Sequence, residues 1–347
     1  MLRTGKKFSK PALSRVINGD TQLKSAPEAP AKTRLDLLLV EDCPQFNRST
    51  LQSFIKDGCV TVNGKIIKKP NYEVSPSASV VLKVPEKQSA PDLKDILLYE
   101  DEDCLVINKP AGLLSMTKGQ YTPEPTLEDY GLLVHRLDRG TSGVVILAKN
   151  EKTQSFLRRQ FQDRRAHKTY YAIVAGIPKL PSAKIDLPIT RSLKHPTTFE
   201  VSPNGKPSQT FYRVVSTRSI SSTTEVGFDS NINNKAISLL ELKPITGRTH
   251  QLRVHLKYLG HPIIGDPIYS DIPAPRLFLH ANSLEITIPG IPYRVRKTFT
   301  APLPESFLEV FPSLRKNPAF SQSKTTSKAK SAPSGSNYSE DFVRSSL

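Results

Sequence analysis

Residues 133–149 constrain this chain more than any other stretch of its 347 residues. One carboxylate, Asp138, lies between Arg136 and Arg139, and small residues then lead into the apolar run 144–148. A short apolar run bounded by turn residues is typical of a buried strand. The stretch therefore predicts a charged loop at the end of a core strand. By charge pattern alone, such a loop is a solvated surface turn, because exposed ion pairs contribute little to stability.

The composition favours a nucleic-acid partner. The formal net charge is +17, and such an excess of Lys and Arg attracts polyanions through phosphate neutralisation and counterion release. An anionic membrane surface is the weaker alternative, because no basic amphipathic helix stands out and no apolar run reaches the roughly 20 residues of a membrane span. The three cysteines form no Cys-x-x-Cys pair. We therefore expect a cytoplasmic protein without disulfides.

Three separated motifs resemble one enzyme family. The string His135-Arg-Leu-Asp138-x-x-Thr-Ser-Gly143 is similar to the signature of the RluA-type pseudouridine synthases, in which the aspartate is catalytic. Asn108-Lys-Pro-Ala-Gly112 and residues 242–269 also match that family. The resemblance covers roughly residues 33–310. It implies that Asp138 is the catalytic residue, that Tyr170 is the active-site tyrosine and that Arg253 is the ion partner of the aspartate.

The residues around Arg253 support its assignment independently. A helix after Thr246-Gly247-Arg248-Thr249 would turn Leu252 and Leu256 inward, and Arg253 would lie on the same face. A buried arginine needs an anionic partner, because an unpaired buried charge is costly. We therefore expect an ion pair between Arg253 and Asp138, which would favour the ionised form of the carboxylate.

The chemistry of uridine isomerisation suits these residues. The bond from ribose to base nitrogen must break, and the freed uracil must rotate and rejoin through carbon five. A carboxylate could stabilise the charge at the anomeric carbon, trap it covalently or remove a neighbouring proton. Tyr170 would pack against the flipped base. No cofactor fingerprint or metal-ligand spacing occurs, so we expect neither a cofactor nor a metal.

A smaller RNA-binding module precedes these motifs. Two short helices, the second at residues 48–56, precede an Asn63-Gly64 hairpin signal. The pattern resembles the module of a small-subunit ribosomal protein that also occurs in RNA-modifying enzymes. We expect Arg48, Lys56 and Lys65 to contact phosphates there, and Arg136 and Arg248 to bind RNA at the catalytic site.

The sequence thus predicts an α+β protein in five parts. They are a disordered basic arm (1–32), the two-helix and hairpin RNA-binding domain (33–84), a linker (85–95), a catalytic domain with a mixed, mainly antiparallel sheet and flanking helices (96–312), and a disordered basic tail (313–347). The arm also resembles a transit peptide in its Ser-rich composition, but it contains Asp20 and Glu28 and no convincing amphipathic helix.

We expect a monomer that isomerises uridine in structured RNA, most readily large-subunit ribosomal RNA. Transfer RNA is the alternative substrate. A non-catalytic RNA-binding assembly factor is the alternative function, but that reading predicts an eroded catalytic trio, whereas Asp138, Tyr170 and Arg253 are all present.

Overall fold

The computed structural model describes residues 32–195, 197–220, 236–290, 294–317, 320 and 342–343. The chain divides into two compact units. The first contains the residues up to Gln88 together with the loop Thr117–Glu124, and the second contains Ser89–Met116 and the residues from Pro125 onward. Nearly all of the predicted basic arm and most of the predicted tail lie outside the described residues.

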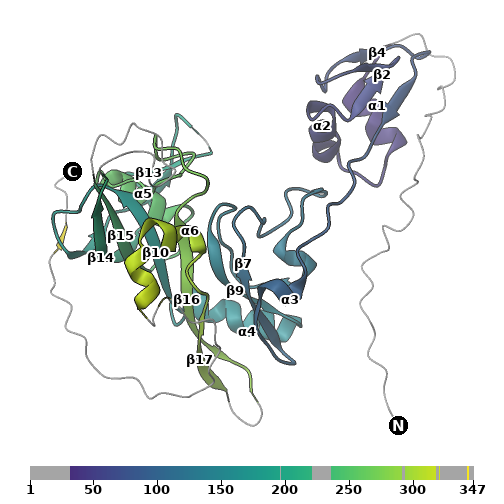
Figure 1. Ribbon diagram of the computed structural model, residues 1–347. Coiled ribbons are helices and arrows are strands. Elements are labelled where there is room, and N and C mark those ends of the chain that lie inside the picture. Colours follow the sequence, from purple (N-terminus) through teal and green to yellow (C-terminus); the bar gives the residue numbers. More distant parts are fainter. Residues whose placement is uncertain are drawn as a thin grey trace, which may run out of the picture. The chain divides into compact units, whose positions relative to one another are not determined.

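The first unit is built from two helices and short strands (Figure 1). Its elements are β1 (Thr33–Arg34), α1 (Leu35–Asp42), α2 (Arg48–Lys56), β2 (Val60–Val62), β3 (Lys65–Ile66), β4 (Glu73–Val74) and β5 (Val80–Leu82). Helix α2 has the predicted bounds, and the side chain of Asn47 caps it by accepting a hydrogen bond from the Thr50 N–H at 2.9 Å. Helix α1 follows Arg34, and the preceding Thr33 is held in β1 opposite Val74.

The predicted hairpin of the first unit is present. Asn63 and Gly64 both have positive φ angles, 50° and 76°, as a two-residue hairpin turn requires. Strand β2 pairs with β3 across this turn and with β5 on its other side. The helices cover the strands with a core that includes Leu35, Leu51 and Ile55, all fully buried.

A loop from the middle of the sequence completes this unit. The ring of Tyr121 packs edge-on against Phe46 and Phe54, with centroid distances of 6.0 and 5.6 Å. The Gln120 side chain accepts a hydrogen bond from the Asn47 N–H and donates one to the Gln45 carbonyl. The loop therefore belongs to the first unit although both of its flanks belong to the second.

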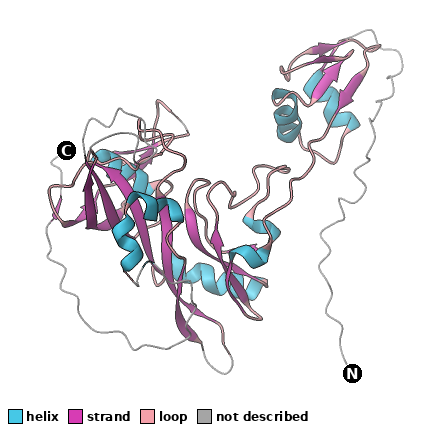
Figure 2. Ribbon diagram, viewed as in Figure 1, coloured by secondary structure: helices cyan, strands magenta, loops and turns pink. Residues whose placement is uncertain are grey.

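The second unit is organised around one large sheet (Figures 1 and 2). Within the described residues its strands run in the order β18-β11-β14-β15-β10-β16-β9-β7-β6, with β17 paired to β16 and β8 to β9. Their bounds are β6 (Leu97–Glu100), β7 (Cys104–Lys109), β8 (Leu132–Leu133), β9 (Ser142–Ala148), β10 (His167–Ala175), β11 (Ser182–Asp186), β14 (Gln209–Ser219), β15 (Ala236–Pro244), β16 (Leu279–Ile288), β17 (Val295–Thr300) and β18 (Phe342–Val343). A separate ribbon pairs β12 (Ile189–Arg191) with β13 (Phe199–Val201).

Helices complete the second unit. They are α3 (Leu93–Ile96), α4 (Glu151–Gln162), α5 (Gln251–Tyr258) and α6 (Glu305–Val310), with 3₁₀ turns at Leu127–Asp129 and Pro312–Lys316. The Asn150 side chain caps α4 by accepting a hydrogen bond from the Thr153 N–H at 2.9 Å. None of the helices in the described part of the chain is long and apolar enough to cross a bilayer.

The sheet is mixed and mainly antiparallel, which confirms the predicted fold class. Among its described pairings only β9 with β16 and β11 with β18 are parallel. The β9–β16 pairing depends on Gly143, whose φ is +118°. A Cβ at this position would lie 2.1 Å from the Ala281 carbonyl oxygen, so only glycine fits.

Pairing sets the length of two strands in the second unit. Strand β16 runs without a break from Leu279 to Ile288, because pairing with β10 continues across its polar residues through a register shift. Strand β14 continues to Ser219 in pairing with β15. Residues 221–235 lie outside the described residues.

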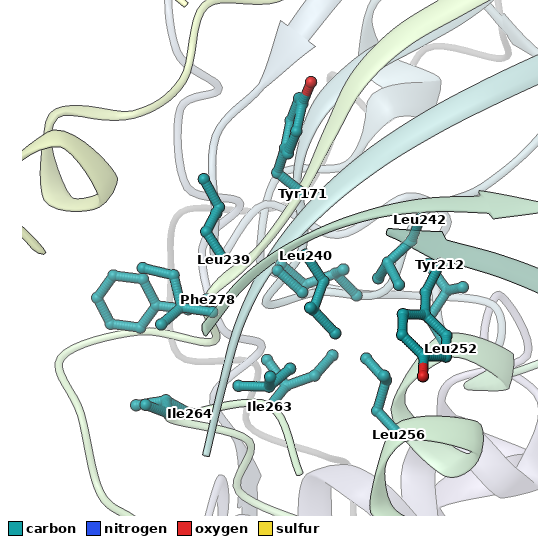
Figure 3. Packing of buried hydrophobic residues seen from close by; sticks show 14 of the residues in the cluster. Tyr171, Tyr212, Leu239, Leu240, Leu242, Leu252, Leu256, Ile263, Ile264 and Phe278 are labelled. Atoms are coloured by element: carbon teal, nitrogen blue, oxygen red, sulfur yellow. The ribbon is translucent and has the colours of Figure 1, made fainter. Parts of the chain in front are cut away.

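The core of the second unit fixes the helix that carries Arg253. Leu252 and Leu256 point from α5 toward Leu240 and Leu242 of β15, as Figure 3 shows. All four leucines are buried, with exposed fractions between 0 and 6%. Since burying a leucine side chain stabilises a fold by about 1.5–3 kcal/mol, this contact holds α5 firmly against the sheet.

Candidate active site

Asp138 lies in the loop between β8 and β9, and this loop is held by the segment that follows β7. The hydroxyl of Ser115 donates a hydrogen bond to the Leu137 carbonyl at 2.6 Å and accepts one from the Leu137 N–H at 3.1 Å. The Gly112 N–H donates to the Arg139 carbonyl at 2.8 Å. The backbone on both sides of Asp138 is therefore anchored to a neighbouring segment.

Lys109 reinforces this anchor from within the core. It is fully buried, and its ammonium donates to the carbonyls of Pro110, Leu113 and Arg139 at 3.0, 2.7 and 3.1 Å. Burial is the main influence that lowers the pKa of Lys109 to about 7, whereas the charge of Asp138 raises it. Because three carbonyls match the three ammonium hydrogens, the contacts themselves favour the charged form. One side chain thus ties the Asn-Lys-Pro-x-Gly segment to the Asp138 loop.

Arg253 connects Asp138 to a second carboxylate. Its Nη1 donates to Asp138 Oδ2 at 3.0 Å, while Nε and Nη2 donate to the two oxygens of Asp266, each at 2.7 Å. Arg253 is 4% exposed and Asp266 is 1% exposed. Burial disfavours the guanidinium charge, but the hydrogen bonds and charge of Asp266, with a smaller effect of Asp138, raise the pKa of Arg253. The predicted ion pair between Arg253 and Asp138 is present.

Asp266 is itself held by the backbone. Its Oδ1 accepts hydrogen bonds from the N–H groups of Ile268 and Tyr269, at 2.9 and 3.1 Å. The ring of Tyr269 lies 5.0 Å from the Arg253 guanidinium carbon, a distance suited to a cation–π contact. Arg253 is therefore fixed on one side by Asp266 and on another by an aromatic face, and it presents one nitrogen to Asp138.

His250 borders the carboxylate on the other side. Its backbone is left-handed (φ +55°), and its Nε2 is 3.9 Å from Asp138 Oδ2. The Tyr269 hydroxyl accepts a hydrogen bond from the Phe199 N–H at 2.9 Å, so its own hydrogen is available to His250 Nδ1 at 2.8 Å. This pattern places the proton of a neutral imidazole on Nε2, the nitrogen that faces Asp138.

Asp138, Tyr170 and Arg253 line one cavity of about 510 Å³. Tyr170 reaches it from β10, where it pairs with Leu242 of β15 and Ala281 of β16. Burial and the charge of Asp138 raise the pKa of the Tyr170 phenol, so it is protonated at neutral pH. Among the described residues no hydrogen-bond partner of its hydroxyl is found. The structure thus brings together the three residues predicted to be catalytic, with the carboxylate of Asp138 24% exposed.

The residues predicted to bind RNA fall into two groups. Arg136 and Arg248 are exposed and line the cavity. Arg48, Lys56 and Lys65 belong to the first unit, where the two lysines are exposed. The Arg48 guanidinium donates two hydrogen bonds to the buried carboxylate of Asp36, at 3.0 and 2.9 Å. Arg48 thus compensates the buried charge of Asp36, while 49% of its own side chain remains exposed.

Sequence reasoning missed several residues around Asp138 and Arg253, among them Asp266 and Lys109. Asp266 was part of a recognised motif, but its pairing with Arg253 could not be read from their separation of 13 residues. Lys109 occupied a turn motif whose Pro and Gly already had an explanation. In the described ranges no group of three or more His, Cys, Asp or Glu side chains is arranged to hold a metal ion.

Sequence comparisons with known proteins agree on one family. The sequence model of the RNA pseudouridylate synthase family matches residues 103–258, and that of the S4 domain matches residues 33–80. An uncharacterized RNA pseudouridine synthase of Bacillus subtilis is 32% identical over 84% of this chain and 98% of its own length. Ribosomal large subunit pseudouridine synthase D of Xylella fastidiosa is 32% identical over 87% of this chain and 95% of its own length. The solved structure of human RNA pseudouridylate synthase domain containing 4 gives a TM-score of 0.49 at 26% identity, covering 64% of this chain and 94% of that one.

Proposed function

The chain belongs to the RNA pseudouridine synthase family, and on that premise we propose that it isomerises specific uridines in large-subunit ribosomal RNA, with Asp138 as the catalytic residue. Relatives that are similar over more than four-fifths of this chain carry the name ribosomal large subunit pseudouridine synthase D. The S4 domain in front of the catalytic region and the net charge of +17 support a large RNA substrate.

One observation carries the assignment of Asp138. Its carboxylate is partly exposed in a cavity, and the buried side of the same group is held 3.0 Å from Arg253. An ion pair in a solvated surface turn would not need a buried arginine to hold its carboxylate. A carboxylate that is fixed, charged and accessible can act at the anomeric carbon of a ribose entering the cavity.

The neighbouring side chains divide the remaining tasks. Tyr170 offers a ring against which the flipped uracil can pack, and its protonated hydroxyl can donate a hydrogen bond to the base. Arg136 and Arg248, exposed beside the cavity, can neutralise phosphates of the flipped nucleotide and its neighbours. Arg253 keeps the Asp138 carboxylate oriented while the base leaves and returns.

No group enters or leaves during this reaction. The base separates from C1′ with the bonding electron pair, turns within the cavity and reattaches through C5, and the C5 hydrogen is lost while N1 regains a proton. The structure is compatible with Asp138 stabilising the cationic sugar, bonding to it or removing a proton from it.

The predicted cytoplasmic location and monomeric state stay predictions, which cell fractionation and gel filtration would test.

Pseudouridine mapping tests the proposed substrate. Total RNA from cells lacking the gene is compared with RNA from the parent and from cells carrying the gene on a plasmid. We expect one or more large-subunit ribosomal positions to lose pseudouridine and to regain it with the plasmid. Loss confined to transfer RNA would contradict the ribosomal substrate, and unchanged pseudouridine at every position would contradict a role for this enzyme in those cells.

A further inference from the structure

Lys168 is a cation inside the cavity to which the proposed mechanism gives no task. It lies in β10 two residues before Tyr170, and both side chains line the cavity. Its Nζ is close to the turn after β15, because a methyl group built on Gly247 would be 3.7 Å from it. Burial lowers the pKa of His135, whose ring stacks on Phe161, and the nearby charge of Lys168 lowers it further.

The ammonium of Lys168 has no counter-ion in the described part of the chain. Neither a hydrogen bond nor an ion pair to its Nζ is found there, although the residue is largely shielded from water. Burial alone lowers the pKa of Lys168 to about 8, and no carboxylate offsets that effect. The side chain is therefore mainly charged at neutral pH, and holding it unpaired costs stability. An anionic or electron-rich ligand in the cavity would remove that cost.

Position separates Lys168 from the exposed cations of the cavity. Arg136, Arg164 and Arg248 are exposed, where phosphates of a bound RNA can reach them. Lys168 is only partly exposed, and it is the near neighbour of Tyr170 on one strand. Residues two apart on a strand point to the same face, about 6.5–7 Å apart, and both of these side chains line the cavity. A base packed on Tyr170 would thus bring one edge to Lys168.

We propose that Lys168 is a further catalytic residue, whose ammonium binds a carbonyl oxygen of the flipped uracil and stabilises the negative charge of the base while it is detached from ribose. The inference rests on the proposed function. When the C1′–N1 bond breaks, its electron pair stays on the uracil and is shared between N1 and the carbonyl oxygens. The new C5–C1′ bond then uses an electron pair of this anion. Lys168 neither gains nor loses a proton in the cycle.

Single-turnover rates test the role of Lys168. Enzyme in excess is mixed with an in-vitro transcript of large-subunit ribosomal RNA, and pseudouridine formation is followed at a position identified by the mapping above. The variants are Lys168→Met, Lys168→Gln and Lys168→Arg, with Lys152→Met, an exposed lysine of α4, as the matched control. We expect the Met and Gln variants to lose roughly 100-fold or more in rate, as removal of one stabiliser of developing charge does elsewhere. Arg should recover part of the loss, and Lys152→Met should equal the wild type.

The salt dependence of RNA binding separates this role from phosphate contact. A phosphate contact contributes about 0.9 to the slope of log affinity against log salt concentration, and less for single strands. We expect Lys168→Met to keep the wild-type slope and to melt no lower than the wild type, because it removes a buried charge. A reduced slope with an unchanged single-turnover rate would overturn the inference in favour of phosphate binding.

The Gln variant sharpens the result further. It can donate a hydrogen bond but carries no charge, so a wild-type rate would overturn stabilisation of an anion. Failure of the proposed function would look different, because the wild-type enzyme itself would then leave the transcript unmodified.

Discussion

Asp266 binds the Arg253 guanidinium through two hydrogen bonds of 2.7 Å, and the third side of the same guanidinium points to Asp138. This fork fixes the plane of the guanidinium, since two parallel N–H···O bonds define an orientation as well as a distance. Asp266 is far less exposed than Asp138. Because Asp266 is buried in the core and fixes Arg253, Arg253 in turn holds the carboxylate of Asp138 in place in the cavity.

Asp266→Asn should impair both activity and stability. The substitution keeps the size of the side chain but removes the charge that compensates buried Arg253, and breaking a buried pair costs about 3–5 kcal/mol. A guanidinium displaced by about 1 Å would lower turnover roughly 100-fold. Urea unfolding and single-turnover pseudouridine formation measure the two effects. Asp271→Asn, which changes an exposed acid in the following loop, should match the wild type in both. Full activity in the Asp266→Asn variant would show that the activity of the site does not depend on Asp266.

Arg253→Leu should abolish detectable turnover and lower the free energy of unfolding, because it leaves Asp266 buried without its partner. Arg253→Lys keeps one charge but cannot form the fork, so we expect it to recover stability better than activity. The same two assays apply, with Arg159→Leu on the exposed face of α4 as control. Unchanged turnover in the leucine variant would refute the ion pair as a functional contact.

His280 should make the second unit sensitive to acid. Arg276 donates to the Ser142 hydroxyl at 2.6 Å, which leaves the hydroxyl hydrogen for His280 Nδ1 at 2.9 Å and keeps the imidazole neutral. Burial, with a smaller effect of Arg276, lowers the pKa of His280 to about 4 from 6.5. The unfolded chain therefore binds the extra proton first, and stability is lost as the pH falls from about 6.5 to about 4, at about 1.4 kcal/mol per pH unit.

The matched variants for this prediction are His280→Gln and His195→Gln. Urea unfolding at pH 7, 6 and 5 should show a shallower loss of stability for His280→Gln than for the wild type, whereas exposed His195 should have no such influence. Parallel pH profiles of the wild type and His280→Gln would show that His280 does not cause the acid sensitivity.

The lysines of the first unit should contribute charge rather than sequence recognition. Lys56→Met and Lys65→Met are each expected to lower the salt slope of ribosomal RNA binding by up to about 0.9, in proportion to one phosphate contact. Lys94→Met, an exposed lysine of the second unit, is the control. Binding isotherms at several salt concentrations give the slopes. If both slopes equal that of the wild type, the first unit does not use these lysines for RNA.

Local sequence patterns predicted the elements better than their connections. Arg48–Lys56 and Asn63-Gly64 were identified because apolar periodicity and hairpin signals act over a few residues. By contrast, the single long β16 could not be told from two short strands, since its polar residues Asn282 and Ser283 interrupt the apolar pattern and only pairing with β10 carries the strand through. The inclusion of Thr117–Glu124 in the first unit likewise depends on Tyr121 meeting rings that lie far away in sequence.

In the candidate site, too, local sequence patterns predicted some features, and only the folded structure reveals the others. Burial of Arg253 followed from its position between Leu252 and Leu256, and the cost of an unpaired buried charge then predicted a carboxylate beside it. That two carboxylates share this arginine could not be predicted, because nothing local to Asp266 in the sequence marks it as buried. Lys168 and Lys109 were also out of reach, since a lysine in a basic chain is normally solvated and only the folded structure shows which ones are enclosed.

The catalytic role of Asp138 is tested by the Asp138→Asn variant. Asparagine preserves the size of the side chain and can still meet Arg253, so the protein should fold, whereas the negative charge at the anomeric carbon is lost. Purified wild-type and variant enzymes are incubated in excess with unmodified large-subunit ribosomal RNA, and pseudouridine is mapped over time. We expect conversion by the wild type and none above background by the variant at equal RNA affinity. Conversion by the Asp138→Asn variant at a rate near that of the wild type would contradict the catalytic role of Asp138.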